Sequence, residues 1–142
     1  MSELAQLLKI GALGALHRGA GPSEIQVWLG VPLARYVNDV GVEIWKYGPL
    51  QLTIARDRLK AFKLESSGSE PLPATLQKLD IPTSQLTPYD FIILLDGFDV
   101  SWQVDGERSF DRQLCLRTEG GVRAFFDLER RELQSLQMHW ED

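Results

Sequence analysis

The chain has 142 residues, of which 44% are hydrophobic and 25% are charged, and its formal net charge is −5. This length and composition are typical of one globular domain or of two small modules that share a core. The acidic balance argues against a nucleic-acid-binding surface, which needs clustered lysines and arginines. The longest apolar run is far shorter than the roughly 18 residues that cross a membrane. We therefore expect partners other than nucleic acid or lipid.

A single cysteine, Cys115, excludes an intrachain disulfide and is typical of a protein from a reducing compartment. The N-terminal segment differs from a secretory signal peptide. Glu3 lies where a basic region is needed, and Lys9 interrupts the apolar stretch. Both features favour a cytoplasmic location.

The first half of the sequence begins with helical spacing and then changes to strand alternation. Leucines at helical spacing predict a helix over residues 2–17, with Ser2 as its N-cap. A second, short helix is expected to begin at Pro22 and to stop at Gly30. Apolar and polar residues then alternate, which predicts three strands joined by tight turns, over residues 42–47, 50–54 and 59–64.

The second half repeats this order after a linker. A segment rich in Ser, Gly and Pro over residues 66–71 marks the linker, and a short helix is expected over 73–79. Thr87 and Pro88 have the features of a helix start, and this helix should end near Gly97. Alternation then predicts strands over residues 100–104, 112–118 and 122–128, with a last strand that ends near Met138.

The two halves align with one another. The apolar pattern of residues 50–54 matches that of residues 122–126. In the next strand of each half, three apolar residues recur at the same spacing. They are Leu59, Phe62 and Leu64 in the first half and Leu133, Leu136 and Met138 in the second. Alternating hydrophobic residues recur in any meander. The match therefore has two explanations, a structural duplication or a coincidence of β patterning.

We expect an α+β fold in which short helices pack on antiparallel meander sheets, arranged as two tandem α-βββ modules. The modules would form one continuous curved sheet or two packed sheets. The expected division of the chain has three parts: an N-terminal helix with the first module in residues 1–66, a linker with a short helix in 67–83, and the second module in 84–142.

Residues 21–52 contain a short helix that ends in Leu29-Gly30-Val31-Pro32 and a strand that contains Trp45-Lys46-Tyr47-Gly48. This pattern resembles that of small bacterial helix-plus-sheet modules, including the beta-lactamase-inhibitor-protein-like fold and immunity-type proteins of bacterial toxin systems. The resemblance covers roughly residues 21–65. The resemblance implies that the glycine and proline end the helix and that the tryptophan and tyrosine pack in or line the sheet. It also implies that the partner is another protein, a toxin or effector.

Patterns of known catalytic and metal-binding sites are missing from the sequence. The potential metal ligands His17, Cys115 and His139 lie far apart in the expected elements. The chain contains no G-x-S-x-G, no G-x-G-x-x-G, no P-loop and no H-E-x-x-H. Cys115 is expected in the middle of a strand, where nothing activates a thiol. We therefore expect no enzyme activity, no metal and no cofactor.

Four acidic residues and one tryptophan are the candidate partner-binding residues: Asp96, Asp99, Asp105, Glu107 and Trp102. The acids are ordinary helix-end and turn residues, a patch that docks a basic partner, or groups for acid–base catalysis or cation binding; the first two explanations are favoured. Trp102 is a candidate hot-spot residue, because tryptophan is enriched at the centres of interfaces. We expect its side chain on the strand face opposite to Val100 and Val104.

These observations favour a non-catalytic protein-binding protein of the bacterial immunity or inhibitor type, which acts through a sheet face and acidic loops. Two other functions stay open. One is a structural or assembly subunit that forms a homodimer or larger homo-oligomer. The other is a small-ligand-binding domain with a pocket between a helix and the sheet.

Overall fold

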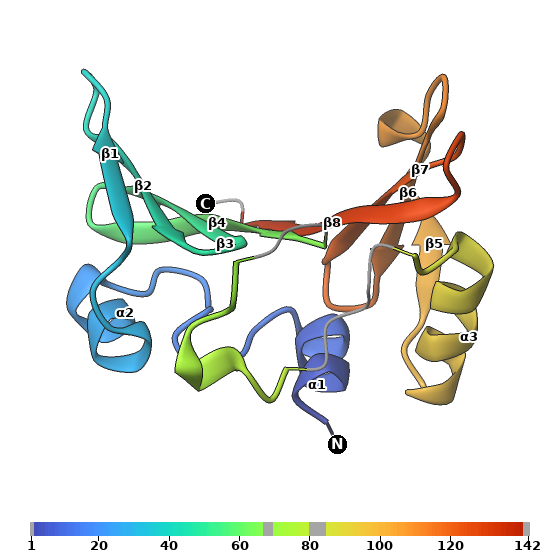
Figure 1. Ribbon diagram of the computed structural model, residues 1–142, viewed down its shortest axis with the longest axis horizontal. Helices are drawn as coiled ribbons and strands as arrows, with labels where there is room; N and C mark the ends of the chain where they lie inside the picture. Colours follow the sequence, from blue (N-terminus) through green and yellow to red (C-terminus); the bar gives the residue numbers. More distant parts are fainter. Residues whose placement is uncertain (1, 67–69, 80–84, 141–142) are drawn as a thin grey trace.

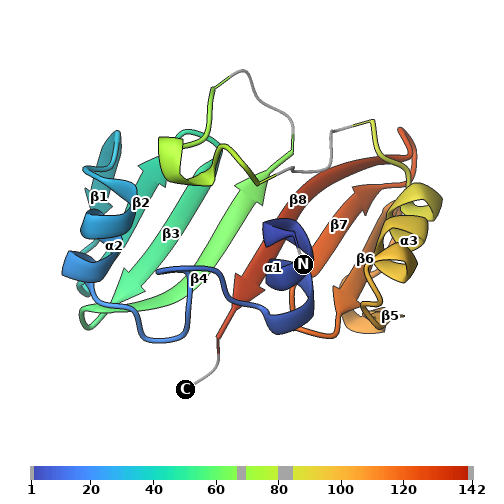
Figure 2. The same cartoon turned by 90° about the horizontal axis from the view of Figure 1, so that it is seen from below.

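Eight strands form one antiparallel sheet, and the α-helices lie on one of its two faces (Figure 1). The computed structural model describes residues 2–66, 70–79 and 85–140. In this part of the chain, three α-helices pack beneath a sheet with the strand order β1-β2-β3-β4-β8-β7-β6-β5 (Figure 2). The expected α+β class with an antiparallel sheet is confirmed.

The first half contains the helices α1 and α2 and the strands β1 to β4. Their bounds are Glu3–Ile10, Pro22–Leu29, Ala34–Val37, Val42–Tyr47, Leu50–Ala55 and Arg58–Glu65. A 3₁₀ turn, η1, covers Ala74–Leu76, within the segment that was expected to form a short helix. Residues 67–69 and 80–83 of the expected linker lie outside the described residues.

Helix α1 is shorter than the expected helix over residues 2–17. Its start is as predicted, since the Ser2 hydroxyl accepts a hydrogen bond from the Ala5 amide at 3.1 Å. The helix stops before Gly11, because this glycine takes a left-handed conformation with φ at +78°. Two leucines stay buried in the turn that follows, Leu13 and Leu16. Their burial explains the apolar spacing that predicted a longer helix.

The second half contains helix α3 and the strands β5 to β8. Their bounds are Pro88–Gly97, Trp102–Val104, Gln113–Thr118, Arg123–Asp127 and Glu132–His139, with a 3₁₀ turn, η2, at Gly106–Arg108. The predicted helix start is confirmed, since the Thr87 hydroxyl accepts a hydrogen bond from the Asp90 amide at 3.1 Å. Among the described residues, no helix has the length and apolar character that a membrane span needs.

The first half has a fourth strand, β1, that the expected α-βββ module lacks. Strand β1 lies at one edge of the sheet and pairs with β2. Three of its four residues are exposed, so it has no alternation of buried and exposed residues. Such alternation is the main signal of a strand in a sequence, which explains why β1 was missed.

The two halves repeat each other in register as well as in strand order. Leu52 pairs with Phe62 in the first half, and Ala124 pairs with Leu136 at the matching place in the second. Each half also has an irregularity in the corresponding hairpin, at Thr53/Ile54 and at Phe125/Phe126. The structure therefore matches the alignment of the two halves that the sequence shows.

Strands β4 and β8 join the two halves into one sheet. They pair antiparallel from Ala61 to Glu65 of β4. The pairing extends beyond β8, because the Trp140 amide donates a hydrogen bond to the Lys60 carbonyl at 2.9 Å. Of the two expected arrangements, the continuous sheet is the correct one.

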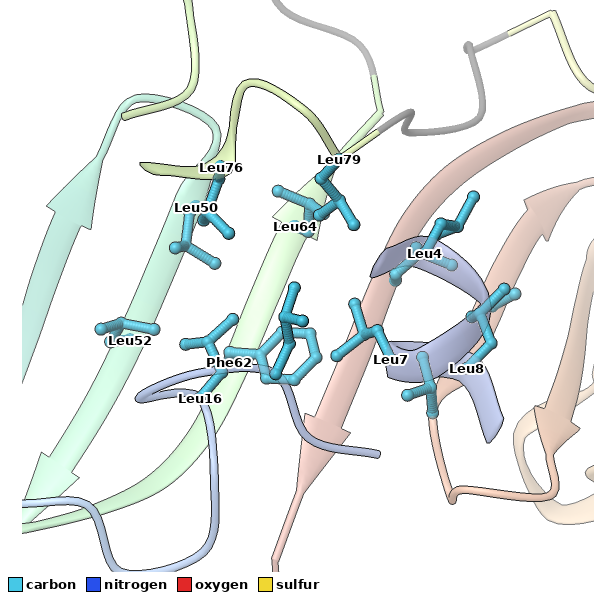
Figure 3. Packing of buried hydrophobic residues seen from close by; sticks show 14 of the residues in the cluster. Leu4, Leu7, Leu8, Leu16, Leu50, Leu52, Phe62, Leu64, Leu76 and Leu79 are labelled. Carbon is cyan, nitrogen blue, oxygen red and sulfur yellow. The ribbon is translucent and has the colours of Figure 1, made fainter. Parts of the chain in front are cut away.

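Helix α1 lies over β8, beside the junction of β8 with β4, on the helix side of the sheet (Figure 3). Its side chains Leu4, Leu7 and Leu8 are almost fully buried, in one cluster with Phe62 of β4. The end of the helix reaches the second half, where the Gly120 amide donates a hydrogen bond to the Leu8 carbonyl at 3.1 Å. Helix α1 therefore contacts both halves of the sheet.

Gly120→Ala should destabilise the protein. An added Cβ would lie 2.4 Å from the Gly11 nitrogen and 2.7 Å from the Ile10 carbonyl carbon. Both are backbone atoms at the end of α1, so we expect the free energy of unfolding to fall by about 1–3 kcal/mol. Gly97→Ala is the control, since nothing lies within 4 Å of its added Cβ. Urea denaturation measures the free energy of unfolding of both variants. A Gly120→Ala variant that is as stable as the Gly97→Ala control would contradict this prediction.

Candidate functional site

The sheet face opposite the helices carries the candidate site. Alternation puts the buried side chains Leu52 and Phe126 on the helix side and the adjacent Gln51 and Phe125 on the other side. Figure 1 shows both ends of the sheet rising on this second side, so the face is concave. We call it the open face. Its central side chains are Gln51, Thr53, Ala61, Lys63, Glu65, Arg123, Phe125, Asp127, Ser135, Gln137 and His139.

Two depressions lie next to each other on the open face. One has a volume of about 470 Å³ and the other about 340 Å³. Lys63, Phe125 and Gln137 line both of them and so mark the centre of the site. Both depressions open broadly to solvent. Such a surface fits side chains of another polypeptide better than a small molecule, which needs a pocket that encloses it.

Phe125 is the aromatic residue at the centre of the open face. The next residue, Phe126, is buried against Phe91 of α3, with the two ring centroids 5.6 Å apart. This contact fixes the orientation of β7 and turns Phe125 to the open face. The strand partners of Phe125 are Cys115 and Ser135. A partly exposed aromatic ring in a polar surround is typical of the core of a protein interface.

Cys115 is fully buried beside Phe125. Its amide donates a hydrogen bond to the Ser109 hydroxyl at 2.9 Å, and this hydroxyl donates to the Asp105 carbonyl at 2.8 Å. Burial raises the pKa of the Cys115 thiol to about 11, and the Asp105 charge adds to this effect. The thiol is therefore neutral at physiological pH and poorly suited to act as a nucleophile.

The four candidate acids lie in two groups on the two sides of the sheet. Asp96 and Asp99 are at the end of α3 on the helix side, whereas Asp105 and Glu107 belong to the η2 segment beside the open face (Figure 1). The Asp99 side chain is fully exposed, and its backbone carbonyl accepts a hydrogen bond from Lys9 Nζ at 3.0 Å. The structure therefore does not bring the four acids together as one patch.

Asp105 is held by two arginines of the same chain. Its carboxylate accepts a hydrogen bond from Arg123 Nε at 2.9 Å and one from Arg108 at 3.3 Å. The Arg123 hydrogen bond, more than any other contact, holds the pKa of Asp105 below its usual range, because it stabilises the charged carboxylate. These contacts fasten η2 to β7 and orient the Arg123 side chain at the edge of the open face.

The expected orientation of Trp102 is wrong. Residues two positions apart in a strand point to the same face, so Trp102 and Val104 share a face. Trp102 pairs with the buried Thr118, which places its side chain on the helix side. There its ring packs against the core, and its Nε1 donates a hydrogen bond to Asp96 Oδ1 at 3.2 Å. Binding of a partner through Trp102 stays a prediction.

The potential metal ligands remain apart in the fold. His17 Nε2 lies 2.6 Å from Glu24 Oε2, and His139 is the last residue of β8. Among residues 2–66, 70–79 and 85–140, no three His, Cys, Asp or Glu side chains are placed to hold a metal ion. The open face offers aromatic, amide and charged groups for contact instead.

The central residues of the open face were not among the sequence candidates. One signal could have found Phe125, because a buried Phe126 in an alternating strand implies an outward neighbour. Lys63 and Gln137 have no such signal. They meet only because β4 pairs with β8, from the other half of the chain.

Comparisons with known proteins identify no family. No protein-family model matches the chain, and none of the curated proteins is significantly similar to it. Among solved structures, the chain is similar to an extracellular protein containing an SCP domain from Bacillus anthracis str. Ames, with 15% sequence identity and a TM-score of 0.50. The match covers 84% of this chain and 42% of that protein, so the chain spans less than half its length. The similarity concerns the fold alone.

Native Cys115 should react very slowly with a disulfide reagent at pH 8. The thiol is buried and its pKa is raised to about 11, so both access and thiolate formation are suppressed. Unfolding in guanidinium chloride should bring the reaction to the rate of an ordinary cysteine. Absorbance of the released thiolate follows the reaction, and a fast reaction of the native protein would show that the thiol is accessible.

Asp105→Asn should remove a pH-dependent part of the stability. Since the pKa of Asp105 is lower in the folded chain, its contribution is full above the unfolded value of about 3.9 and is lost as the pH falls through the folded pKa. We expect the variant to be about 1–2 kcal/mol less stable at pH 7 and to lose less stability than wild type on acidification.

Denaturant unfolding at neutral and acidic pH measures this difference. Glu107→Gln is the matched control, because Glu107 lies on the same turn and is exposed. Parallel stability curves for wild type and Asp105→Asn across the acidic range would contradict the prediction.

Proposed function

We propose that the chain is a non-catalytic protein-binding protein and that its open face holds the partner. One observation carries this proposal: the sheet is wide and concave, and the α-helices of the described residues all lie on its other face. An antiparallel sheet commonly packs one face on the core and leaves the other solvated. Here the solvated face is hollowed by two adjacent depressions around Phe125.

The residues of the open face support this proposal. Aromatic residues and arginine are enriched at the centres of protein interfaces, and Phe125 and Arg123 lie close together on β7. The ion pair between Arg123 and Asp105 holds the arginine side chain in place. A side chain that is already ordered loses little conformational freedom on binding, which favours affinity.

A small-ligand-binding function has less support. The space between the helices and the sheet is filled by apolar side chains, among them Leu7, Leu16 and Phe62 (Figure 3). The depressions of the open face are broad and lined by many polar groups. Pockets for small molecules instead enclose most of the ligand and are mainly apolar.

The more specific expectations from the sequence stay predictions. They are the immunity or inhibitor role, the basic toxin or effector as partner, and the cytoplasmic location. Three of the four acidic candidates, Asp96, Asp99 and Glu107, are exposed and are accessible to a basic partner. Asp96 and Asp99 lie on the helix side, whereas Asp105 and Glu107 lie beside the open face. Variants of the first two acids therefore test a surface that is separate from the open face.

Phe125→Ala should strongly reduce capture of a partner from native lysate. We expect tagged wild type to retain a protein in stoichiometric amount, and retention to fall about tenfold in the variant, as for an interface hot spot. Tyr89→Ala is the control, since Tyr89 is 71% exposed and lies on α3 on the helix side. Circular dichroism checks that both variants fold. Capture of nothing by wild type, or undiminished capture by Phe125→Ala, would refute the proposal.

Exposed apolar residues near β1 favour a second candidate function, self-association. Strand β1 pairs with β2 on one side, and among the described residues no strand pairs with its outer side. Its one charged residue, Arg35, lies 2.6 Å from Glu43 and is therefore neutralised. Two β1 strands can pair antiparallel across a twofold axis and so extend the sheet. The exposed apolar residues here are Val31, Leu33, Tyr36, Val37 and Val40.

Val37→Lys should keep the protein monomeric. A lysine on an edge strand opposes pairing with a second copy, because the two like charges would meet. If wild type forms a dimer through β1, light scattering should show a dimer for wild type and for the control Ile93→Lys on α3, and a monomer for Val37→Lys. A wild type that stays monomeric at all concentrations would remove this second candidate.

A further inference from the structure

One row of side chains crosses the open face from one edge of the sheet to the other. Residues that pair across neighbouring antiparallel strands lie side by side on the same face. Four members of this row are cations, three are amides, and none is a carboxylate. We call it the cationic row; from β5 to β1 it contains Gln103, Arg117, Arg123, Gln137, Lys63, Gln51, Lys46 and Ala34.

The cationic row keeps uncompensated positive charge in both halves of the sheet. Arg123 pairs with Asp105 at 2.9 Å, and Lys63 pairs with Glu65 at 3.1 Å. Lys46 in the first half and Arg117 in the second are exposed, and no ion pair joins either of them to a carboxylate of the described residues. The chain as a whole has a net charge of −5, so the positive charge of this row is opposite in sign to the net charge of the chain.

The side chains that flank the centre of the cationic row are mostly neutral; the exception there is Glu65, which neighbours Ser135 and forms an ion pair with Lys63 of the row at 3.1 Å. Thr53 and Ala61 are neighbours on one side, and Phe125 and Ser135 are neighbours on the other. A polypeptide that lies along the row can therefore place acidic side chains against the cations. Its remaining side chains would then contact neutral groups and the Phe125 ring.

We propose that the cationic row binds an extended acidic segment of a partner protein, which runs across the strands of the sheet. This inference rests on the proposed function and names the chemistry of the partner. The row crosses seven gaps of about 4.8 Å, or about 34 Å, which an extended segment of about ten residues covers. Complementary charge steers such a segment to the row and fixes its register. The basic partner predicted from the sequence concerns the acidic candidates, of which Asp96 and Asp99 lie on the helix side and Asp105 and Glu107 lie beside the open face.

A nucleic acid fits this surface less well. A phosphate backbone needs a broad basic patch. Beside the row, the depressions of the open face have two further cations, Arg108 and Arg112, and each forms an ion pair with a carboxylate. Glu65 and Asp127 also lie close by on this face. Single-stranded nucleic acid also needs several aromatic rings on which its bases stack. The central side chains of the open face include one such ring, Phe125.

The test is an NMR titration with peptides of about ten residues, a length that matches the row. The peptides alternate serine with glutamate, glutamine or lysine, and an oligothymidylate of similar length serves as the nucleic-acid probe. Side-chain amide signals of Gln51, Gln103 and Gln137 report directly from the cationic row. We expect the glutamate peptide to shift these signals and to bind about tenfold more tightly than the glutamine peptide, with an affinity that falls as salt is added.

Two charge-matched variants locate the binding site. The row variant combines Lys46→Gln, Lys63→Gln and Arg117→Gln. The control variant combines Arg56→Gln, Lys78→Gln and Arg131→Gln, three exposed residues in turns. Each variant lowers the net charge from −5 by three, to −8. We expect the row variant to lose about tenfold in affinity for the glutamate peptide and the control to lose no more than about twofold.

Three results would overturn the inference. The glutamate peptide binds no better than the glutamine peptide, the control variant loses as much affinity as the row variant, or the oligothymidylate shifts the row amides at lower concentration than the glutamate peptide. The last result would assign the surface to nucleic acid. The Phe125→Ala capture experiment tests the proposed function separately. A captured protein that depends on Phe125 but not on the row charges would keep the protein-binding function and remove only the acidic segment.

Discussion

The antiparallel pairing of β4 with β8 is the constraint on which the rest of the structure depends. Without this pairing, β4 and β8 would each be a long edge strand of a four-stranded sheet with one apolar face. Exposed edge strands of this kind pair readily with other chains. The contact from Ala61 to Glu65 satisfies both edges with one set of hydrogen bonds. Because β4 and β8 are the last strands of their halves and run antiparallel, the two halves are related by an approximate twofold rotation.

The two faces of the sheet follow from this arrangement. Helices α2 and α3 each cover the outer part of one half, and α1 lies between them over β8, next to the junction of the halves (Figure 2). The backbone of α1 approaches the β6–β7 turn so closely that only glycines fit at positions 11 and 120. With the apolar side chains covered by this layer, the other face keeps its polar residues and its concave shape. The candidate site is thus a product of the whole sheet.

Elements with a local pattern could be predicted from the sequence. The alternation of apolar and polar residues in β3 and β7 predicts both strands correctly. It also predicts the correct alignment of the two halves, because the same strand pairing recurs in both. Elements without such a pattern were missed or misjudged. Strand β1 is short and mostly exposed. Residues 11–17 keep buried leucines in a turn that resembles helical spacing, although Gly11 ends the helix.

The candidate site could not be predicted in this way, because pairing between distant strands creates it. The four cations of the row are scattered through the sequence. The net charge of −5, which counts all residues of the chain, gives no sign of a local positive surface. Only the register of the strands collects them on one face, while the acidic candidates, which are close in sequence, end on both sides of the sheet. Electrostatic selection of a partner depends on the potential of the contact surface. In the proposed function, the partner of the open face is therefore selected by the local charge of the row and not by the net charge of the chain.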